Sequence, residues 1–185
     1  MKSKEYSNMI DLVSCLSSYT GKYCVLKMSS AFPNYVTYSD LDILCDDIED
    51  MKRHILSFLE GVSGIKVSID QRQEFTHIDV YRNGESRLDF KFDLVDNLQK
   101  TYNKTPVVFN LSKDIIESSV LKNGVYVPSM PYEMVVRMLE YLEYKDHRPD
   151  KIKHLNFVNY NKQRFEKEFN LLWSKLTESE ELQNG

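Results

Sequence analysis

The stretch Ser39-Asp40-Leu41-Asp42-Ile43-Leu44 decides the fold that we predict for this chain. Apolar and polar residues alternate in it, so Leu41 and Ile43 point to one side of a strand while Asp40 and Asp42 point to the other. Two carboxylates side by side on a strand repel each other and raise each other's pKa unless a cation lies between them. A divalent metal ion that also holds phosphate oxygens is a common natural solution. A solvated strand face with two chance aspartates is the alternative.

The composition is that of a soluble globular protein. The chain has 185 residues, of which 42% are hydrophobic and 28% charged, enough to bury a core as one domain or a compact pair. A formal net charge of −4 argues against a nucleic-acid-binding protein that relies on bulk positive charge. No apolar segment is long enough for a signal peptide or a membrane-spanning helix, so we expect a cytoplasmic protein without a membrane partner. Cys15, Cys24 and Cys45 lack metal-ligand spacing and lie among apolar neighbours, which indicates buried, reduced thiols.

Hydrophobic periodicity predicts an α/β arrangement in the first half of the chain. The expected elements are a helix over 4–19, strands over 23–27, 40–44 and 65–70, and a helix over 48–60 that ends at Gly61. A polar and aromatic connection with a turn at Pro33-Asn34 joins the first two strands. Alternating residues over 74–81 and 86–95 predict a β-hairpin.

The turn of this hairpin, Arg82-Asn83-Gly84, sets the register of its strands. A two-residue turn would place Ile78 opposite Asp89 and mix apolar with charged residues on both faces. A three-residue loop with Gly84 in the left-handed conformation instead places Ile78 opposite Leu88, which agrees with the hydrophobic pattern. We therefore predict the second register, with His77 directly across from Asp89. One face of the hairpin then carries His77, Asp79, Arg87, Asp89 and Lys91.

After Asp96 the pattern changes. Residues 97–131 contain short apolar runs and turn signals, and from Tyr132 the periodicity is helical. We expect a helix over 132–145, a break at His147-Arg148-Pro149, a helix over 150–160, and a last helix that carries Phe165, Phe169, Leu172 and Leu176. The predicted fold class is α/β, with a mixed-sheet domain over 1–96 followed by a mostly helical C-terminal domain over 97–185.

The order of these elements and acidic residues resembles the nucleotidyltransferase superfamily, which includes polymerase beta, aminoglycoside nucleotidyltransferases and minimal nucleotidyltransferases. That family has Gly-Ser at a helix start, then Asp-x-Asp, and a third carboxylate on a later strand. Here Ser29-Ser30 stands in the Gly-Ser place, and Asp40-Leu41-Asp42 follows after nine residues. Arg87-Leu88-Asp89-Phe90-Lys91 resembles the strand of the third carboxylate. The resemblance covers about residues 4–96 and implies a nucleotidyltransferase-like catalytic domain.

This resemblance implies a metal-dependent transfer of a nucleoside monophosphate from a nucleoside triphosphate to an acceptor. Stabilising the negative charge that spreads during the transfer is the main task of such a site. Asp40, Asp42 and Asp89 are then the catalytic residues that hold two magnesium ions, and Asp89 takes the proton of the acceptor. Asp79 and Asp93 are alternatives to Asp89, and Asp93 shares its face of the strand.

Four further residues are implied in binding the nucleotide. Ser29 and Ser30, with nearby backbone N–H groups, would hold the phosphates, and Lys27 and Lys91 would pair with phosphate charge. Ser29 departs from the family, because a glycine there lets the backbone approach the phosphates closely and a serine does so at some conformational cost. A rebuilt phosphate site and a catalytically idle descendant are both compatible with this change.

We expect the second half of the chain to meet the acceptor, a small molecule or a sugar phosphate, and we expect the reaction to belong to surface-polysaccharide biosynthesis. The basic and aromatic residues proposed for this contact are Tyr144, Lys145, Arg148 and His154, together with His77 of the hairpin. A solvated helix face is the alternative. Two other functions stay open: an idle binding or regulatory module of the same fold, antitoxin-like, and a scaffold whose acidic patch binds a basic protein.

Overall fold

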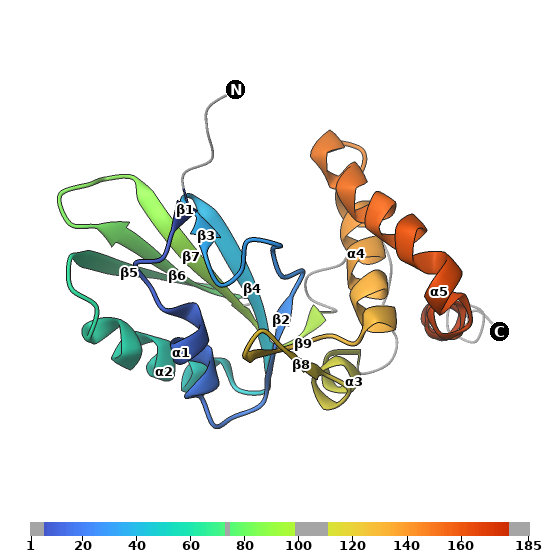
Figure 1. The fold of residues 1–185 in the computed structure, drawn as a ribbon, viewed down its shortest axis with the longest axis horizontal. Coiled ribbons are helices and arrows are strands. Elements are labelled where there is room, and N and C mark those ends of the chain that lie inside the picture. The colour runs from blue at the N-terminus through green and yellow to red at the C-terminus, as the bar shows by residue number, and fades with distance from the viewer. Residues whose placement is uncertain (1–5, 73–74, 99–110, 178–185) are drawn as a thin grey trace. The chain divides into compact units, whose positions relative to one another are not determined.

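The computed structural model of the protein describes residues 6–72, 75–98 and 111–177. By its internal contacts the chain divides into two compact units (Figure 1). The first unit comprises the chain up to Asp96 together with Val120–Val127, and the second comprises Asn97–Ser119 and the chain from Pro128 onward. The segment 120–127 therefore belongs to the first unit although it lies in the second half of the sequence.

A five-stranded mixed sheet forms the centre of the first unit. Its strand order is β2 (Tyr23–Leu26), β4 (Ser39–Cys45), β7 (Leu88–Val95), β6 (Thr76–Arg82) and β5 (Ile65–Gln71). Strands β4 and β7 are parallel neighbours, and the other adjacent pairs of this sheet are antiparallel. Two short ladders accompany the sheet: β1 (Tyr6–Ser7) pairs with β3 (Tyr35–Val36), and β8 (Val120–Lys122) pairs with β9 (Val125–Val127).

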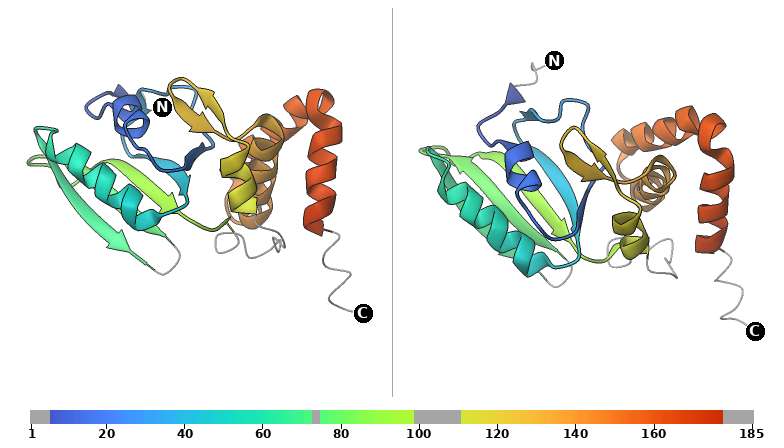
Figure 2. Two further views of the ribbon diagram at one scale, coloured as in Figure 1. Left: turned by 90° about the horizontal axis from the view of Figure 1, so that it is seen from below. Right: turned by 60° about the horizontal axis from the view of Figure 1, so that its bottom comes forward.

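One face of the five-stranded sheet is apolar and packs against two helices, α1 (Leu12–Ser17) and α2 (Ile48–Glu60) (Figures 1 and 2). The shared core includes Leu12, Leu16, Met51 and Ile55 from the helices and Ile43, Ile78, Phe90 and Phe92 from the strands. Helix α2 begins where the Asp47 carboxylate accepts a hydrogen bond from the backbone N–H of Asp50, and it ends at Gly61. Because side chains alternate along a strand, this packing leaves the polar residues on the opposite face.

The described part of the second unit is helical. Helices α3 (Leu111–Glu117), α4 (Met130–Tyr144) and α5 (Ile152–Thr177) follow in order, with the 3-10 turn η2 (Pro149–Lys151) before α5. Helix α4 starts after Ser129 and carries a proline in its first turn, where a missing N–H breaks no hydrogen bond. Helix α5 bends at Phe165, whose φ of −125° and ψ of 26° are not helical. Helices α4 and α5 pack against each other (Figure 2).

The predicted fold class is confirmed, since a mixed α/β sheet is followed by a helical region. Helix α2 has the predicted bounds 48–60, and strands β2, β4 and β5 lie close to theirs. The helix predicted over 4–19 is wrong in extent, because α1 covers only Leu12–Ser17 and Tyr6–Ser7 forms β1. The two helices predicted after Pro149 are one kinked helix, α5. Within the described ranges, no helix has both the length and the apolar character needed to cross a membrane.

The predicted register of the β6–β7 hairpin is wrong. Ile78 lies opposite Phe92 instead of Leu88, which is a shift of four residues along β7. Gly84 has the predicted positive φ, 81°, but the connection between the strands is longer than three residues. A shift by an even number of residues keeps every side chain on its face. The hydrophobic pattern therefore could not distinguish the two registers.

Candidate functional site

The face of the sheet opposite α1 and α2, here called the polar face, carries charged residues in two rows that cross the strands. The first row consists of Asp70, His77, Asp93 and Asp42, and the second of Ser68, Asp79, Lys91 and Asp40. Asp40 and Asp42 share this face because Leu41 and Ile43 point into the core. The parallel pairing of β4 with β7 makes Asp93 the direct neighbour of Asp42.

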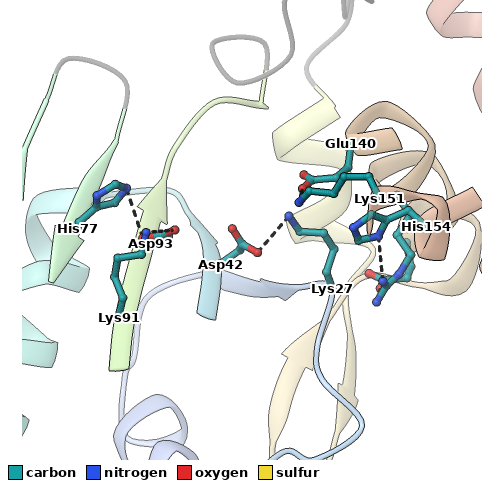
Figure 3. Close-up of polar contacts among 10 residues, drawn as sticks. Lys27, Asp42, His77, Lys91, Asp93, Glu140, Lys151 and His154 are labelled. Carbon is teal, nitrogen blue, oxygen red and sulfur yellow. Dashed lines mark hydrogen bonds and ion pairs between the residues drawn. The ribbon is translucent and has the colours of Figure 1, made fainter. Parts of the chain in front are cut away.

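Two lysines neutralise the adjacent carboxylates Asp42 and Asp93 (Figure 3). Lys27 Nζ lies 3.1 Å from Asp42 Oδ2, and Lys91 Nζ lies 3.0 Å from Asp93 Oδ2. Lys27 comes close because it directly follows β2, in which Leu26 is the ladder partner of Asp42. The side chains of the two lysines are only 13% and 23% exposed, so both ion pairs are partly shielded from water.

The carboxyl group of Asp93 is held in an unfavourable environment for its charge. Burial raises the pKa of Asp93 to about 6, and the charges of Asp42 and Asp40 act in the same direction while Lys91 opposes them. His77 Nε2 lies 3.3 Å from Asp93 Oδ1, and burial together with the charge of Lys91 lowers the pKa of His77. A partly buried carboxyl group whose pKa is raised in this way is typical of a functional site.

The donor chemistry of Asp40, Asp42 and Asp93 suits magnesium, which prefers carboxylate oxygens. As the side chains stand, however, the described residues contain no group of three or more acidic, histidine or cysteine residues that could hold a metal ion. Lys27 and Lys91 lie where a cation would bind two of the three carboxylates. A divalent ion would therefore have to displace these ammonium groups.

Asp89, which the resemblance implied as the third metal ligand, lies in a different cluster. It is 3% exposed, its Oδ1 accepts a hydrogen bond from Arg82 Nε at 2.8 Å, and its Oδ2 accepts one from the Tyr35 hydroxyl at 2.9 Å. Burial raises the pKa of Tyr35 to about 12, and the hydrogen bond to Asp89 adds to the shift. Both oxygens of Asp89 are thus engaged. The residue beside Asp42 is instead Asp93, the alternative that the sequence had left open.

Within the described residues 6–72, no helix begins at Ser29-Ser30, where the resemblance implied one. Both serines are exposed in a run of turns between β2 and β3. Ser29 Oγ accepts a hydrogen bond from the N–H of Ala31 at 3.2 Å, and the Ser29 carbonyl accepts one from the N–H of Phe32 at 3.2 Å. The segment is a connection with turns, as the sequence predicted, and phosphate binding by the two exposed serines stays a prediction.

The residues predicted to contact an acceptor are divided between the two units. His77 lies on β6 in the first unit, whereas Tyr144, Lys145, Arg148 and His154 belong to the second. Lys145 and Arg148 are exposed, and Arg148 Nε pairs with Asp150 Oδ1 at 3.0 Å. His154 is buried, with its Nδ1 3.3 Å from Arg137 Nη1. As its side chain stands, His154 is therefore shielded from an acceptor, and the contact of the other residues with an acceptor stays a prediction.

A second charged cluster lies mostly buried where α4 meets η2 and the start of α5, and we call it the helix cluster: Glu133, Arg137, Glu140, Lys151 and His154 (Figure 3 labels three of them). Arg137 binds Glu133 through Nε at 2.7 Å and Nη2 at 2.6 Å. Its guanidinium carbon lies 4.3 Å from the centre of the Phe157 ring. Glu140 pairs with Lys151. The sequence showed the spacing of Glu133 and Arg137 on one helix, but it gave no sign of the partners on α5.

Comparisons with known proteins leave the family open. No protein-family model and no curated protein matches the sequence. Among solved structures, the chain is similar to a crystal structure described as "putative nucleotidyltransferase from H. pylori", with 9% identity, coverage of 90% of this chain and 81% of that chain, and a TM-score of 0.42. A TM-score and an identity this low do not assign the chain to a family.

Proposed function

We propose that the protein is a metal-dependent nucleotidyltransferase that moves a nucleoside monophosphate from a triphosphate to a small-molecule or sugar-phosphate acceptor. The observation that carries this proposal is the position of Asp40, Asp42 and Asp93 on one face of the adjacent parallel strands β4 and β7. Three carboxylates on neighbouring strands suit a pair of magnesium ions. The proposal revises the third carboxylate from Asp89 to Asp93.

The residues of the polar face have distinct roles in this proposal. Bound magnesium supplies positive charge at the transferred phosphoryl group, where negative charge develops. Lys27 and Lys91 bind phosphate oxygens of the nucleotide through charge-assisted hydrogen bonds and so fix its position. Asp93 takes the proton of the acceptor hydroxyl, the role that the resemblance gives to the third carboxylate.

The test is nucleotide binding with and without metal. The protein is screened for thermal shift with each of the four ribonucleoside triphosphates, and a rise in Tm is expected only when magnesium is present. Asp42→Asn is expected to abolish that rise. Asp46→Asn makes the same charge change at an exposed position just after β4 and is expected to retain it. Wild-type pyrophosphate release by Asp42→Asn contradicts the proposal.

A catalytically idle binding or regulatory module is the second candidate function. Two observations favour it: Lys27 and Lys91 already neutralise Asp42 and Asp93, and within the described residues the Ser29 segment lacks the helix start of the family that the sequence resembles. This candidate expects a triphosphate to raise Tm equally with and without magnesium, because lysines alone would bind the phosphates. It also expects no pyrophosphate release with any of the four triphosphates.

A further inference from the structure

We infer that Lys27 and Lys91 compete with divalent cations for Asp42 and Asp93, so that free metal binds weakly and metal enters the site together with a polyphosphate. This inference rests on the proposed function and adds the order in which its ligands bind. The carboxylates of the polar face are of a kind that suits a metal ion. The described residues nevertheless contain no group of three or more acidic, histidine or cysteine side chains arranged to hold one.

The two ion pairs occupy the carboxylates directly. Each lysine nitrogen lies within 3.1 Å of a carboxylate oxygen, at Asp42 Oδ2 and at Asp93 Oδ2. A magnesium ion would approach such an oxygen to about 2.0–2.1 Å, and it would repel an ammonium group that stayed beside the same carboxylate. Metal and lysine therefore exclude each other at both positions.

Displacing the lysines without giving them a new partner is unfavourable. Lys27 and Lys91 are largely shielded from water, and their charges are matched by the carboxylates that the metal would take. A polyphosphate removes this difficulty, because its oxygens bind the metal and also accept hydrogen bonds from the released ammonium groups. Metal and polyphosphate then increase each other's affinity, and this coupling is reciprocal.

Each of the two lysines pairs with one of the two adjacent carboxylates, and they lie on or beside different strands. Lys27 reaches Asp42 from the β2 side of β4, and Lys91 reaches Asp93 from within β7. Lys22, at the opposite end of β2, is exposed and serves as the control lysine. Substitution by methionine removes the ammonium group and keeps an unbranched side chain of similar length in all three positions.

The experiment measures the affinity of free Mn²⁺ by electron paramagnetic resonance for the wild type, Lys27→Met, Lys91→Met and Lys22→Met. Each of the first two variants is expected to bind Mn²⁺ about tenfold more tightly than the wild type, a difference of about 1.4 kcal/mol. Lys22→Met is expected to match the wild type. Either site lysine alone suffices for the test, so one variant that fails to fold leaves the other to decide it.

A second measurement separates this inference from the proposed function. Calorimetry with Mn²⁺ and the α,β-methylene analogues of the four ribonucleoside triphosphates is expected to show weaker binding by Lys27→Met and Lys91→Met than by the wild type, opposite to their effect on free Mn²⁺. Site lysine variants that bind free Mn²⁺ no more tightly than the wild type overturn the competition. If the wild type still binds a metal–nucleotide complex, the proposed function survives that result. If neither the wild type nor any variant binds metal or nucleotide, both the competition and the proposed function are contradicted.

Discussion

The polar face of the sheet and the helix cluster both combine carboxylates with basic side chains, but they balance charge differently. In the helix cluster each carboxylate has its own cation, Glu133 with Arg137 and Glu140 with Lys151, and all four side chains are mostly buried. On the polar face Asp42 and Asp93 also each have a lysine, but the strand pairing places these two like charges side by side. Removing one partner of a matched, buried ion pair destabilises a fold, whereas crowded carboxylates repel one another and attract a cationic ligand. The position of a charge relative to its neighbours thus distinguishes the helix cluster from the site that we propose on the polar face.

The largest effect is expected from breaking the helix cluster. Arg137→Met leaves the buried Glu133 carboxylate without its main partner, so the free energy of unfolding should fall by about 3–5 kcal/mol. Trp173 is the single tryptophan of the chain and lies on α5, so its fluorescence during urea unfolding reports on the second unit.

The matched control for this change is an exposed ion pair in the same unit. Lys113 Nζ lies 3.8 Å from Glu117 Oε1, and both side chains are more than half exposed. Lys113→Met should therefore change the free energy of unfolding by less than about 0.5 kcal/mol. Equal effects of the two substitutions would show that the helix cluster does not hold α4 and α5 together.

A smaller loss is expected at Asp89, which shares strand β7 with Asp93 but has matched partners. Asp89→Asn weakens the pairing with Arg82, so stability should fall by about 2 kcal/mol. The first unit contains Cys15 and Cys45, and burial raises the pKa of each thiol to about 12, so both should resist alkylation until that unit opens. Alkylation rates in increasing urea therefore measure the loss.

This substitution also tests the division of roles along β7. Asp89→Asn should leave the magnesium-dependent thermal shift by triphosphate in place, because its oxygens bind Arg82 and Tyr35. If Asp89→Asn keeps full stability but loses metal-dependent nucleotide binding, Asp89 is a metal ligand, as the resemblance implied.

Local pattern predicted helix α2 and the strands of the five-stranded sheet, because alternation with a period of two shows which side chains of a strand share a face. The sharing of one face by Asp40 and Asp42 followed from six residues, and the bounds of α2 followed from its capping and apolar spacing. These features depend on near neighbours in the chain. Nothing more distant is needed to specify them.

The choice between Asp89 and Asp93 could not be made from the sequence, since both lie on the same parity of β7. A shift of four residues preserves the hydrophobic pattern, and the length of the connection after Arg82 and the parallel contact with β4 decide the register. The pair of Lys27 with Asp42 likewise depends on which strands become neighbours. The partners of Arg137 on α5 likewise depend on which helices pack together, so the local sequence could not predict them.

The smallest effect, with a sign opposite to the two above, is expected from Asp93→Asn. The ordinary pKa of an aspartate, 3.8, is raised to about 6 in the folded protein, chiefly by burial. Between about pH 4 and pH 6 the unfolded chain has lost this proton while the folded chain retains it, so the contribution of Asp93 to stability falls as pH rises through this window. Asparagine stays neutral and escapes that fall. The variant should match the wild type near pH 4 and exceed it by on the order of 1 kcal/mol at pH 8.

Urea unfolding followed by far-ultraviolet circular dichroism at pH 4, 6 and 8 measures this difference. Asp46→Asn, at an exposed position, should show a difference from the wild type that does not grow with pH. If Asp93→Asn instead destabilises the protein at pH 8, the ion pair with Lys91 outweighs burial and the repulsion from Asp42, and the polar face is balanced in the same way as the helix cluster. A gain that develops between about pH 4 and pH 6 and persists at pH 8 would mark Asp93 as a carboxylate kept at the expense of stability, which is the expected property of a residue retained for binding a cation.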